Sequence, residues 1–559
     1  MAAEDGARRP AGGGAGFGRR LLQAVPSMLA RVSGYLRAEL RQTTLPVAVF
    51  ERAAPLLLAQ RVVLGLSENG GRWVAPPCHE FELSTPRTGD TSDARGCRRR
   101  PYRSRGPMSE TPADGTRADE TLLDALRKDA VGYFLRTTDP DTGLIADSSR
   151  GGAPCSIAAT GLGLSCFIVG VERALLPRLD AVQRVLAILR FFRDSPQGED
   201  PDATGHRGFY YHFLDMKTGR RVWRCELSTI NTAILIAGVL TCGAYFSAAT
   251  DDEAEIRELA RVLYQRIDWP WATAGGLVLR MGWTPEAGFL NYGWEGYSEA
   301  LLLYLLALGS PTYPLPVASY KEWTATYQWE NLYDIDVLLA APLFQHQLSH
   351  AWIDFRGIRD AFMRSKRSDY FENSRRATQI QRKYALRNPM RFKGYSENCW
   401  GITAGLGPGS VTQPVPGNVE RRFHGYVARG VPFGLDDGTL APWAVAASLP
   451  FAPGIVLAAL RHLLDAYPEV FSADGLMTSF NPSFDAGDGS GRGWLAPEHL
   501  GLDQGPVALM IENHASGLLW RLTRACPAVA NGLRRAGFRG GWLGGDWLEG
   551  GRWLARLCS

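Results

Sequence analysis

The sequence lacks the short motifs that mark several common classes of enzyme. It contains no GxxxxGK[ST] phosphate-binding loop, no GxGxxG fingerprint between a strand and a helix, no GxSxG nucleophile elbow and no HExxH zinc motif. These absences argue against P-loop nucleotide hydrolysis, dinucleotide-dependent redox chemistry, serine-hydrolase chemistry and zinc proteolysis.

Charge and cysteine content exclude further classes of protein. The formal net charge is only +4 over 559 residues, so the composition gives no support for a nucleic-acid or membrane-surface partner. The nine cysteines form no CxxC pair and are odd in number, which argues against a disulfide framework or a zinc cluster. We therefore expect small buried thiols.

Long apolar runs are also missing. No stretch is long enough to span a bilayer, and the apolar segment 230–246, which contains Asn231, is typical of a buried helix. Near the N-terminus, the apolar stretch after Arg20 is broken by Gln23 and Pro26, which does not fit a signal peptide. These features favour the cytoplasm over the periplasm and leave the oligomeric state open.

The first 107 residues differ in composition from the rest of the chain. Ala, Gly and Arg dominate the first twenty positions, and the segment 97–105, CRRRPYRSR, is basic and has no apolar periodicity. Two interpretations remain: an upstream start assigned in a GC-rich frame, with Met108 the true start, or a disordered basic extension. In either case we expect the functional domain to occupy residues 108–559.

From residue 119 onward the pattern is helical. Apolar residues recur near a 3.6-residue spacing in 121–135 and in ten comparable segments, at 156–175, 178–194, 226–247, 252–267, 294–309, 340–362, 374–386, 441–449, 453–466 and 506–524. Long loops rich in Gly, Pro, Trp and Tyr separate them, notably 268–293, 310–336 and 387–440, and alternating strand patterns are rare. About a dozen helices with long aromatic loops are typical of an all-α fold, the (α/α)6 toroid, in which loops at one end of a helical ring form a cleft.

Two stretches place carboxylates among aromatic and amide groups near the start of apolar helical runs. They are YGWEGYSE at 292–299 and LDQGPVALMIEN at 502–513. Carboxylates beside aromatic rings fit a carbohydrate cleft, where acids act on the glycosidic bond and rings stack on sugars. Glu295 follows Trp294 on the loop, and an apolar setting there would raise its pKa, as a general acid requires. Glu299 is explained as a structural residue that interacts with the helix dipole.

Other carboxylates fit either a structural or a functional role. Glu226 precedes a helix start for which Ser228 or Thr229 is the natural N-cap. Asp503 precedes a Pro and an apolar helical run, which is ordinary helix-start chemistry. Asp437 lies in an Asp-Gly sequence of the kind that usually forms a turn, and is a weaker candidate.

The segment 342–356, PLFQHQLSHAWIDFR, carries two histidines. His346 and His350 lie four residues apart, which predicts that they share one face of a helix. Metal ligation is one interpretation, but the glutamate of the HExxH motif is missing. Hydrogen bonding to a substrate, or a network with Asp354 and Arg356, fits the segment better.

Five blocks of sequence resemble, in this order, the bacterial glycoamylase-like family: YGWEGYSEALLLYLLALGSPTYP, PLFQHQLSHAWIDFRGIRD, DYFENSRRAT, DDGTLAPWAVAASLPFAP and LGLDQGPVALMIENHASGLLWRL. The family includes glycoside hydrolases of the endo-β-1,2-glucanase type and related domains of cyclic β-1,2-glucan synthases. The resemblance covers roughly 119–527 and implies an (α/α)6 toroid that acts on β-glucans with no metal and no organic cofactor. It also implies that Glu295 matches the proposed general acid, and that Glu226 and Asp503 match candidates for the base or for substrate contact.

The sequence departs from the family pattern at two positions. The pattern predicts aspartate where Asn231 stands, and SDGP where the chain has Leu406 in GLGP. Losing carboxylates there would alter linkage specificity or impair hydrolysis. We nevertheless predict an inverting β-glucan hydrolase in which Glu295 protonates the glycosidic oxygen and Asp503 or Glu226 activates water. An inverting acid and base lie ~6.5–9.5 Å apart.

The remaining predictions concern contacts with an oligosaccharide or polysaccharide, the expected partner. Trp294, Tyr297, Trp352 and Trp400 are the predicted stacking residues, and His346, His350, Asp354, Arg356 and Asp437 are the predicted polar contacts. Two alternatives use the same scaffold: a non-catalytic glucan-binding protein, suggested by the two departures above, and a transglycosylase.

Overall fold

The computed structural model describes residues 112–544 apart from 416, 418, 488 and 490. These residues all belong to one compact unit, Val62–Ser559. The predicted N-terminal extension, residues 1–107, lies outside the described residues.

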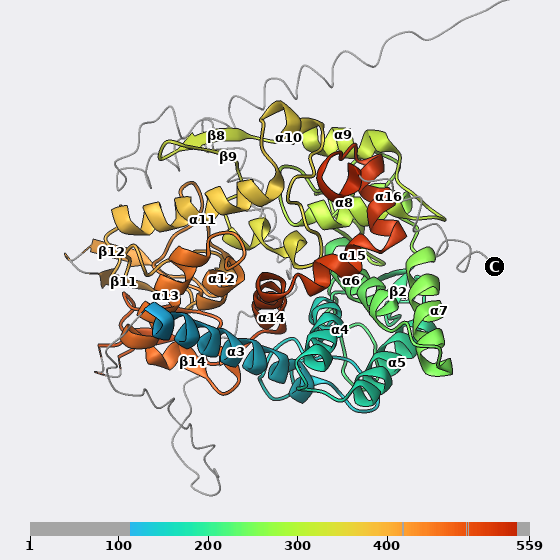
Figure 1. Cartoon of the computed structure of the whole chain (residues 1–559), viewed down its shortest axis with the longest axis horizontal. Helices are drawn as coiled ribbons and strands as arrows, with labels where there is room; N and C mark the ends of the chain where they lie inside the picture. Colours follow the sequence, from blue (N-terminus) through green and yellow to red (C-terminus); the bar gives the residue numbers. More distant parts are fainter. Residues whose placement is uncertain (1–111, 416, 418, 488, 490, 545–559) are drawn as a thin grey trace, which may run out of the picture. The chain divides into compact units, whose positions relative to one another are not determined.

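Helices of the described residues occupy two environments. Five are buried around most of their circumference: α4 (Ile157–Glu172), α6 (Thr229–Tyr245), α8 (Ala300–Gly309), α12 (Pro442–Ala447) and α14 (Gly501–Ala515). Those that alternate with them along the chain bury only one side: α3 (Pro112–Thr137), α5 (Arg178–Asp194), α7 (Asp251–Gln265), α9 (Val317–Ala325), α11 (Tyr370–Arg387) and α13 (Pro453–Ala466). The buried helices form an inner ring and the others an outer ring, so the predicted (α/α)6 toroid is confirmed (Figure 1).

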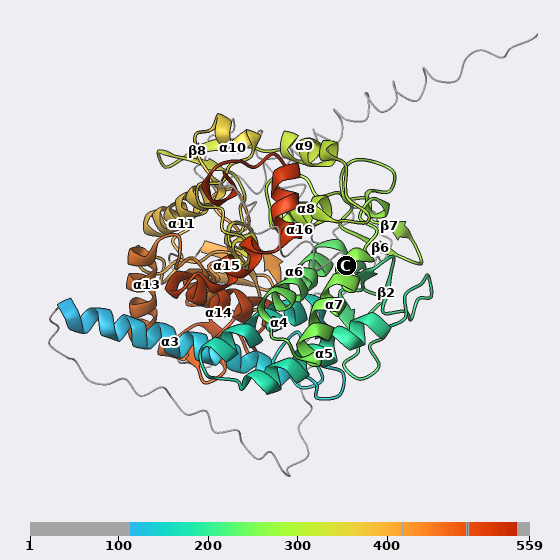
Figure 2. The ribbon, with the colours of Figure 1, turned by 45° about the vertical axis from the view of Figure 1, so that its right-hand side comes forward.

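The inner ring closes on itself. Helix α4 packs against α6, α6 against α8 and α12 against α14, while α14 returns to pack against α4. The sixth inner position, between α8 and α12, is occupied by two short 3-10 helices, η2 (Leu343–His346) and η3 (Leu348–Ala351), the latter of which contacts α8 and α14. Figure 2 shows the same succession of elements from a second direction.

The prediction of a helix over 340–362 was therefore wrong. Side chains from other elements bind the backbone carbonyls that a continuous helix would have used internally. Ser374 donates to the carbonyl of His346, and the indole of Trp520 donates to that of His350, each at 2.7 Å. Tight 3-10 turns leave these carbonyls available to α11 and α15.

The segment 506–524 was also predicted as one helix and is two. Helix α14 begins at Gly501, and α15 (Leu518–Arg524) follows a break at Gly517, which has a φ of 67°. The remaining short helices are α10 (Ala361–Ser365), α16 (Pro527–Arg535), η1 (Trp271–Thr273), η4 (Pro468–Val470) and η5 (Gly541–Gly544).

Close backbone contact between α4 and α6 depends on two glycines. A Cβ atom on Gly161 would lie 2.4 Å from the carbonyl oxygen of Ile234, and one on Gly238 would lie 2.1 Å from that of Gly161. Any larger side chain at either position would force the two helices apart.

Strands in the described residues are short, antiparallel and confined to the loops. They pair as β1 (Cys155–Ser156) with β4 (Phe213–Leu214), β2 (Gly205–His206) with β3 (Phe209–Tyr210), β8 (Trp329–Leu332) with β9 (Ile335–Leu338), β10 (Ala404–Gly405) with β13 (Val427–Ala428), β11 (Thr412–Val415) with β12 (Val419–Arg422), β14 (Phe471–Ser472) with β15 (Gly475–Leu476), β16 (Phe480–Asn481) with β17 (Trp494–Leu495), and β5 (Leu227–Ser228) with β6 (Gly282–Thr284) and β7 (Gly288–Phe289).

The six cysteines in the described residues are free and buried, as predicted. Within the same residues, no helix has both the length and the apolar character of a membrane span.

Candidate active site

Hydrogen bonds join the N-terminal ends of α4 and α6. Strands β1 and β5 run directly into these helices, whose N-caps are Ser156 and Ser228. The carbonyl of His212 accepts from the N–H of Ile157 at 3.3 Å, and the N–H of His212 donates to the carbonyl of Glu226 at 3.0 Å. Glu226 therefore lies at the start of α6, beside the start of α4.

The same end of the ring includes the starts of α8 and α14. The indole N–H of Trp294, ahead of α8, donates to Oγ1 of Thr229 in the first turn of α6 at 3.0 Å. The N–H of Gly501, the first residue of α14, donates to the carbonyl of Asp147 at 2.8 Å, and this loop leads into β1 and α4. The three carboxylate-bearing segments singled out from the sequence thus share one end of the inner ring, which we call the candidate cleft end.

Glu299 has the environment that suits a proton donor. It is the N-cap residue of α8, its side chain makes no capping bond, and the residue is 8% exposed. Its Oε2 atom has no hydrogen-bond partner among the described residues. Burial raises the pKa of Glu299 to about 7, and the nearby side-chain amide of Gln345, which is half-buried, opposes only part of this effect. A carboxyl with a pKa near 7 holds a proton at neutral pH and can release it.

Asp503 is a second buried acid. It lies in the first turn of α14, is 3% exposed, and its Oδ2 atom has no partner among the described residues. Burial raises its pKa well above the ordinary range. The hydroxyl of Thr478 opposes this effect, and the nearby charge of Asp147 adds to it. Burial thus favours the protonated form of the Asp503 carboxyl over the ionised form.

Glu226 is different, because it has a polar partner and contact with solvent. Its Oε1 lies 2.9 Å from Nδ1 of His212, and the two side chains are 19% and 26% exposed. The imidazole of His212 stacks on the ring of Phe213, with 4.0 Å between centroids. This arrangement fixes the orientation of the carboxyl and leaves it within reach of water.

Glu295, the predicted general acid, is exposed. The N–H of the next residue, Gly296, donates to Oγ1 of Thr326 at 2.6 Å, so the loop itself is anchored. The apolar setting predicted for Glu295 lies instead four residues later, at Glu299. A structural role, through the helix dipole, is the role that the sequence predicts for Glu299. The signal that could have identified it is a carboxyl at the start of a wholly apolar helix with no basic residue in the same segment.

The rings of Trp294, Tyr297 and Trp400, predicted to stack on sugars, are buried. The indole N–H of Trp294 already donates to Thr229 in α6, as described above. Tyr297 packs against Tyr327 and Tyr370, with centroids 5.9 and 5.5 Å away. These rings form walls of the core and do not present a free face to a ligand.

Trp352, Asp354 and Arg356 are not brought to the cleft end. The indole of Trp352 is buried and donates to Oγ of Ser165, in the C-terminal half of α4, at 2.9 Å. Asp354 is fully buried and forms ion pairs with Arg356 at 2.8 Å and with Arg524 at the end of α15. This network joins the C-terminal part of the chain to the ring and has a structural role.

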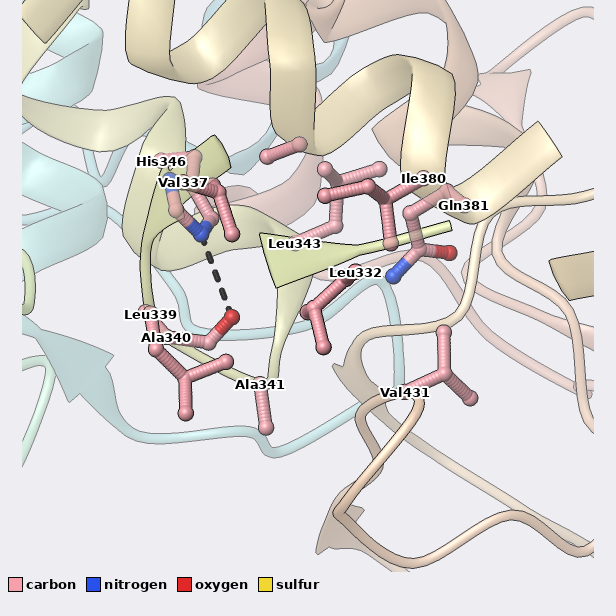
Figure 3. Close-up of a pocket in the computed structure, with 11 residues that line it drawn as sticks. Leu332, Val337, Leu339, Ala340, Ala341, Leu343, His346, Ile380, Gln381 and Val431 are labelled. Atoms are coloured by element: carbon pink, nitrogen blue, oxygen red, sulfur yellow. Dashed lines mark hydrogen bonds between the residues drawn. The ribbon is translucent and has the colours of Figure 1, made fainter. Parts of the chain in front are cut away.

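His346 and His350 are buried and lie in two successive 3-10 turns, where a single α-helix was predicted. Burial lowers the pKa of His346 to about 4 and that of His350 to about 3, so both rings are neutral. They hydrogen-bond to α11 through Asn373 and Ser374, at 3.3 and 3.0 Å. Figure 3 shows the bond from Nε2 of His346 to the carbonyl of Ala340 at the edge of a small cavity, and none of the residues that line this cavity carries a carboxyl.

Asp437 forms a buried ion pair. Both of its oxygens accept from the guanidinium of Arg429, at 2.7 and 2.8 Å, and the Arg429 charge helps to hold the pKa of Asp437 below its usual value in spite of burial. Arg429 also donates to the carbonyls of Gly405 and His424. The pair therefore fixes the loop ahead of α12 and has no free polar atom for a sugar.

The two departures from the family pattern lie at the cleft end. Asn231 is buried in the first turn of α6, where its N–H donates to the N-cap Ser228. Leu406 is buried in a small apolar cluster with Ala496 and Leu500, the residue that precedes α14. An aliphatic side chain thus fills the place near Asp503 where the family pattern predicts a carboxylate.

Glu498 is a further buried acid that no sequence signal identified. It is buried three residues before α14, and its Oε2 has no hydrogen-bond partner among the described residues. Among the same residues, no group of three or more His, Cys, Asp or Glu side chains could hold a metal ion.

Comparison with known proteins identifies relatives over most of the chain. Residues 291–527 match the Glycoamylase family model, described as "Putative glucoamylase". An exo β-1,2-glucooligosaccharide sophorohydrolase (non-reducing end) from Parabacteroides distasonis is 27% identical over 455 residues, which are 75% of this chain and 58% of that protein. The chain therefore spans little more than half the length of this curated relative.

Solved structures show the same relationship. A "putative glucoamylase" from Bacteroides uniformis is 30% identical, with a TM-score of 0.66 over 76% of this chain and 98% of that chain. An endo-β-1,2-glucanase from Chitinophaga pinensis, in complex with sophorotriose and glucose, is 25% identical. Its TM-score is 0.66, and the match covers 76% of this chain and 99% of that chain. The resemblance seen in the sequence blocks is thus confirmed, and the chain belongs to the glycoamylase-like family.

Proposed function

We propose that this chain is a glycoside hydrolase that cleaves β-linked glucose chains, with β-1,2-glucan as its substrate. The sophorohydrolase and the endo-β-1,2-glucanase described above support the reaction and the linkage. The structural observation that carries the proposal is Glu299, a buried carboxyl with an unpartnered oxygen and a pKa of about 7 at the start of an inner helix.

In this proposal Glu299 is the general acid. A glycosidic oxygen must gain a proton as its bond to the sugar breaks, and the donor must be protonated at neutral pH. Burial supplies that condition at Glu299, whereas Glu295 is exposed and is a weaker candidate.

We assign the activation of water to Glu226. A general base must be ionised and reachable by water, and Glu226 is half-buried and held by Nδ1 of His212. Asp503 fits this role less well because burial raises its pKa and so disfavours the ionised form that a base requires. We assign Asp503 to a hydrogen bond with a sugar hydroxyl. For this pair we propose an inverting mechanism, which requires the two carboxyl groups to lie ~6.5–9.5 Å apart.

The proposal is tested by incubating the full chain with β-1,2-, β-1,3-, β-1,4- and β-1,6-glucans. We expect shorter oligosaccharides from β-1,2-glucan, and proton NMR of the first products should show the α anomer. Binding without release of any sugar would favour a non-catalytic glucan-binding protein. Products longer than the substrate would favour a transglycosylase.

A further inference from the structure

Positive charge is concentrated in two stretches of the chain. Residues 356–367 and 521–539 contain ten arginines and lysines and a single acid, Asp360, which gives them a net charge of +9. The whole chain carries a net charge of only +4, so the remaining residues are net acidic. The near-neutral total therefore conceals a local excess of positive charge, and a local field of this kind attracts anionic partners.

Hydrogen bonds join the two stretches. Arg359 and Arg539 exchange backbone hydrogen bonds in both directions, each at 3.0 Å. The guanidinium of Arg364, in α10, donates to the carbonyls of Arg359 and Gly537 at 2.6 and 2.8 Å. The N–H of Gly537 donates to the carbonyl of Arg534, in α16, at 3.0 Å. The arginines around α10 and the end of α16 therefore lie in one region of the molecule.

Four arginines of this region are exposed, and their guanidinium groups make no hydrogen bond or ion pair with the described part of the chain. They are Arg359, Arg367, Arg534 and Arg539, which we call the basic patch. Unpaired cations that lie close together repel one another, and a negatively charged partner relieves this repulsion. The basic patch is therefore suited to an anionic surface.

The acids next to the basic patch are bound to other groups. Asp360 is 1% exposed and accepts from the hydroxyl of Tyr370 at 2.7 Å. Asp369 caps α11 and accepts from the N–H of Glu372 at 2.8 Å. Asp354 is buried in the ion pairs described above. Among the described residues, none of these acids forms an ion pair with an arginine of the basic patch.

Two exposed apolar side chains lie in the segment beside α16. Tyr313 and Val317 are 48% and 41% exposed. Between them, the carbonyl of Leu315 accepts from the guanidinium of Arg535, the last residue of α16, at 2.8 Å. Arginines next to an exposed aromatic ring are typical of surfaces that bind the headgroup region of a bilayer.

The basic patch and the candidate cleft end lie on different parts of the ring. Helix α16 packs on the C-terminal part of α8, where a Cβ on Gly309 would lie 2.1 Å from the carbonyl oxygen of Ala528. Glu299 is the N-cap at the other end of α8. A partner bound at the basic patch would therefore not compete directly with a substrate at Glu299.

We propose that the basic patch docks this chain on the surface of a membrane that contains anionic lipids. Guanidinium groups bind phosphate oxygens through pairs of parallel hydrogen bonds, which suits the phosphates of lipid headgroups. The side chains of Tyr313 and Val317 favour a bilayer over a nucleic acid, because they gain from entering the boundary between headgroups and acyl chains. This inference does not rest on the proposed function.

The test measures binding of the full chain to vesicles of phosphatidylcholine, with and without phosphatidylglycerol. We expect the triple variant Arg359→Gln, Arg534→Gln, Arg539→Gln to lower the partition coefficient on anionic vesicles about 100-fold. The matched control removes three exposed arginines from other elements, in the triple variant Arg117→Gln, Arg391→Gln, Arg422→Gln. Figure 1 shows the starts of α3 and β12, which carry or adjoin two of them, away from α16. The control should bind nearly as wild type, and both variants should keep the wild-type Tm.

A second measurement locates the contact in the wild-type chain. Phenylglyoxal modifies exposed arginines, and mass spectrometry identifies the modified residues with and without vesicles. Protection of the basic patch by phosphatidylglycerol vesicles, with the control arginines still reactive, would support the proposal. Unprotected patch arginines, or equal partition coefficients for the two triple variants, would overturn it. Binding of a DNA duplex, or dimerisation of the chain, in place of binding to anionic vesicles would overturn it as well.

Discussion

Replacing Glu299 with glutamine should abolish hydrolysis and at the same time stabilise the protein at alkaline pH. The wild-type carboxyl is buried without a counter-charge, so its pKa rises from 4.5 to about 7 on folding. Between these two pH values the folded state binds more protons than the unfolded state, and the stability that this group contributes therefore falls as pH rises. Glutamine has a similar shape and never ionises.

The magnitude follows from the two pKa values. A difference from 4.5 to about 7 corresponds to roughly 3 kcal/mol of lost stability once the pH exceeds 7. For a folded unit of roughly 430 residues, this energy corresponds to a change of about 3–4 °C in Tm. We expect Glu299→Gln to unfold at nearly the wild-type temperature at pH 4.5 and about 3 °C above it at pH 8.5.

The assay is thermal unfolding at both pH values, with Glu295→Gln as the matched control on an exposed side chain of the same loop. The control should show no pH-dependent difference from wild type. If Glu299→Gln is no more stable than wild type at pH 8.5, then Glu299 is not a buried, unpaired carboxyl. The assignment of the general acid would lose its basis.

Three further predictions follow from the same geometry. Glu226→Gln should lower kcat by at least about 100-fold, and Asp503→Asn should raise KM more than it lowers kcat; equal losses in kcat for both variants in steady-state kinetics would contradict the assigned roles. The pH profile of kcat/KM should fall above about pH 7 as Glu299 loses its proton, and a flat profile from pH 6 to 9 would contradict this. Arg429→Met should cost about 3–5 kcal/mol in denaturant unfolding because it leaves Asp437 buried and unpaired, and adding Asp437→Asn should recover part of the loss; no loss in the single variant would refute the proposed role of the pair.

The parts of the fold that could be predicted are those in which local pattern and tertiary structure agree. Amphipathic periodicity gave the bounds 178–194 and 453–466 of α5 and α13 without error. The preference of Ser and Thr for N-caps narrowed the cap of α6 to Ser228 or Thr229, and the structure has Ser228. One face of α5 and of α13 is buried, and the capping group of α6 is local in sequence, so in each case the sequence carries the information.

The parts that could not be predicted depend on distant partners. The carbonyls in 343–351 are satisfied by α11 and α15, which turned a predicted helix into 3-10 turns. Spacing could not distinguish the roles of Glu295 and Glu299, because Glu299 is buried against residues distant in sequence. Gln345 lies beside its carboxyl, and Ser349 donates to its backbone carbonyl. Trp352 and Asp354 belong to the family blocks in sequence, yet they lie in the core beyond the reach of the cleft end.

The most direct test of the account is the rate of β-1,2-glucan cleavage by Glu299→Gln and Glu295→Gln, measured side by side as reducing ends released. We expect Glu299→Gln to bind the glucan but to release almost no sugar, and Glu295→Gln to keep a substantial share of the wild-type rate. Wild-type rates from Glu299→Gln, or loss of activity only in Glu295→Gln, would contradict it.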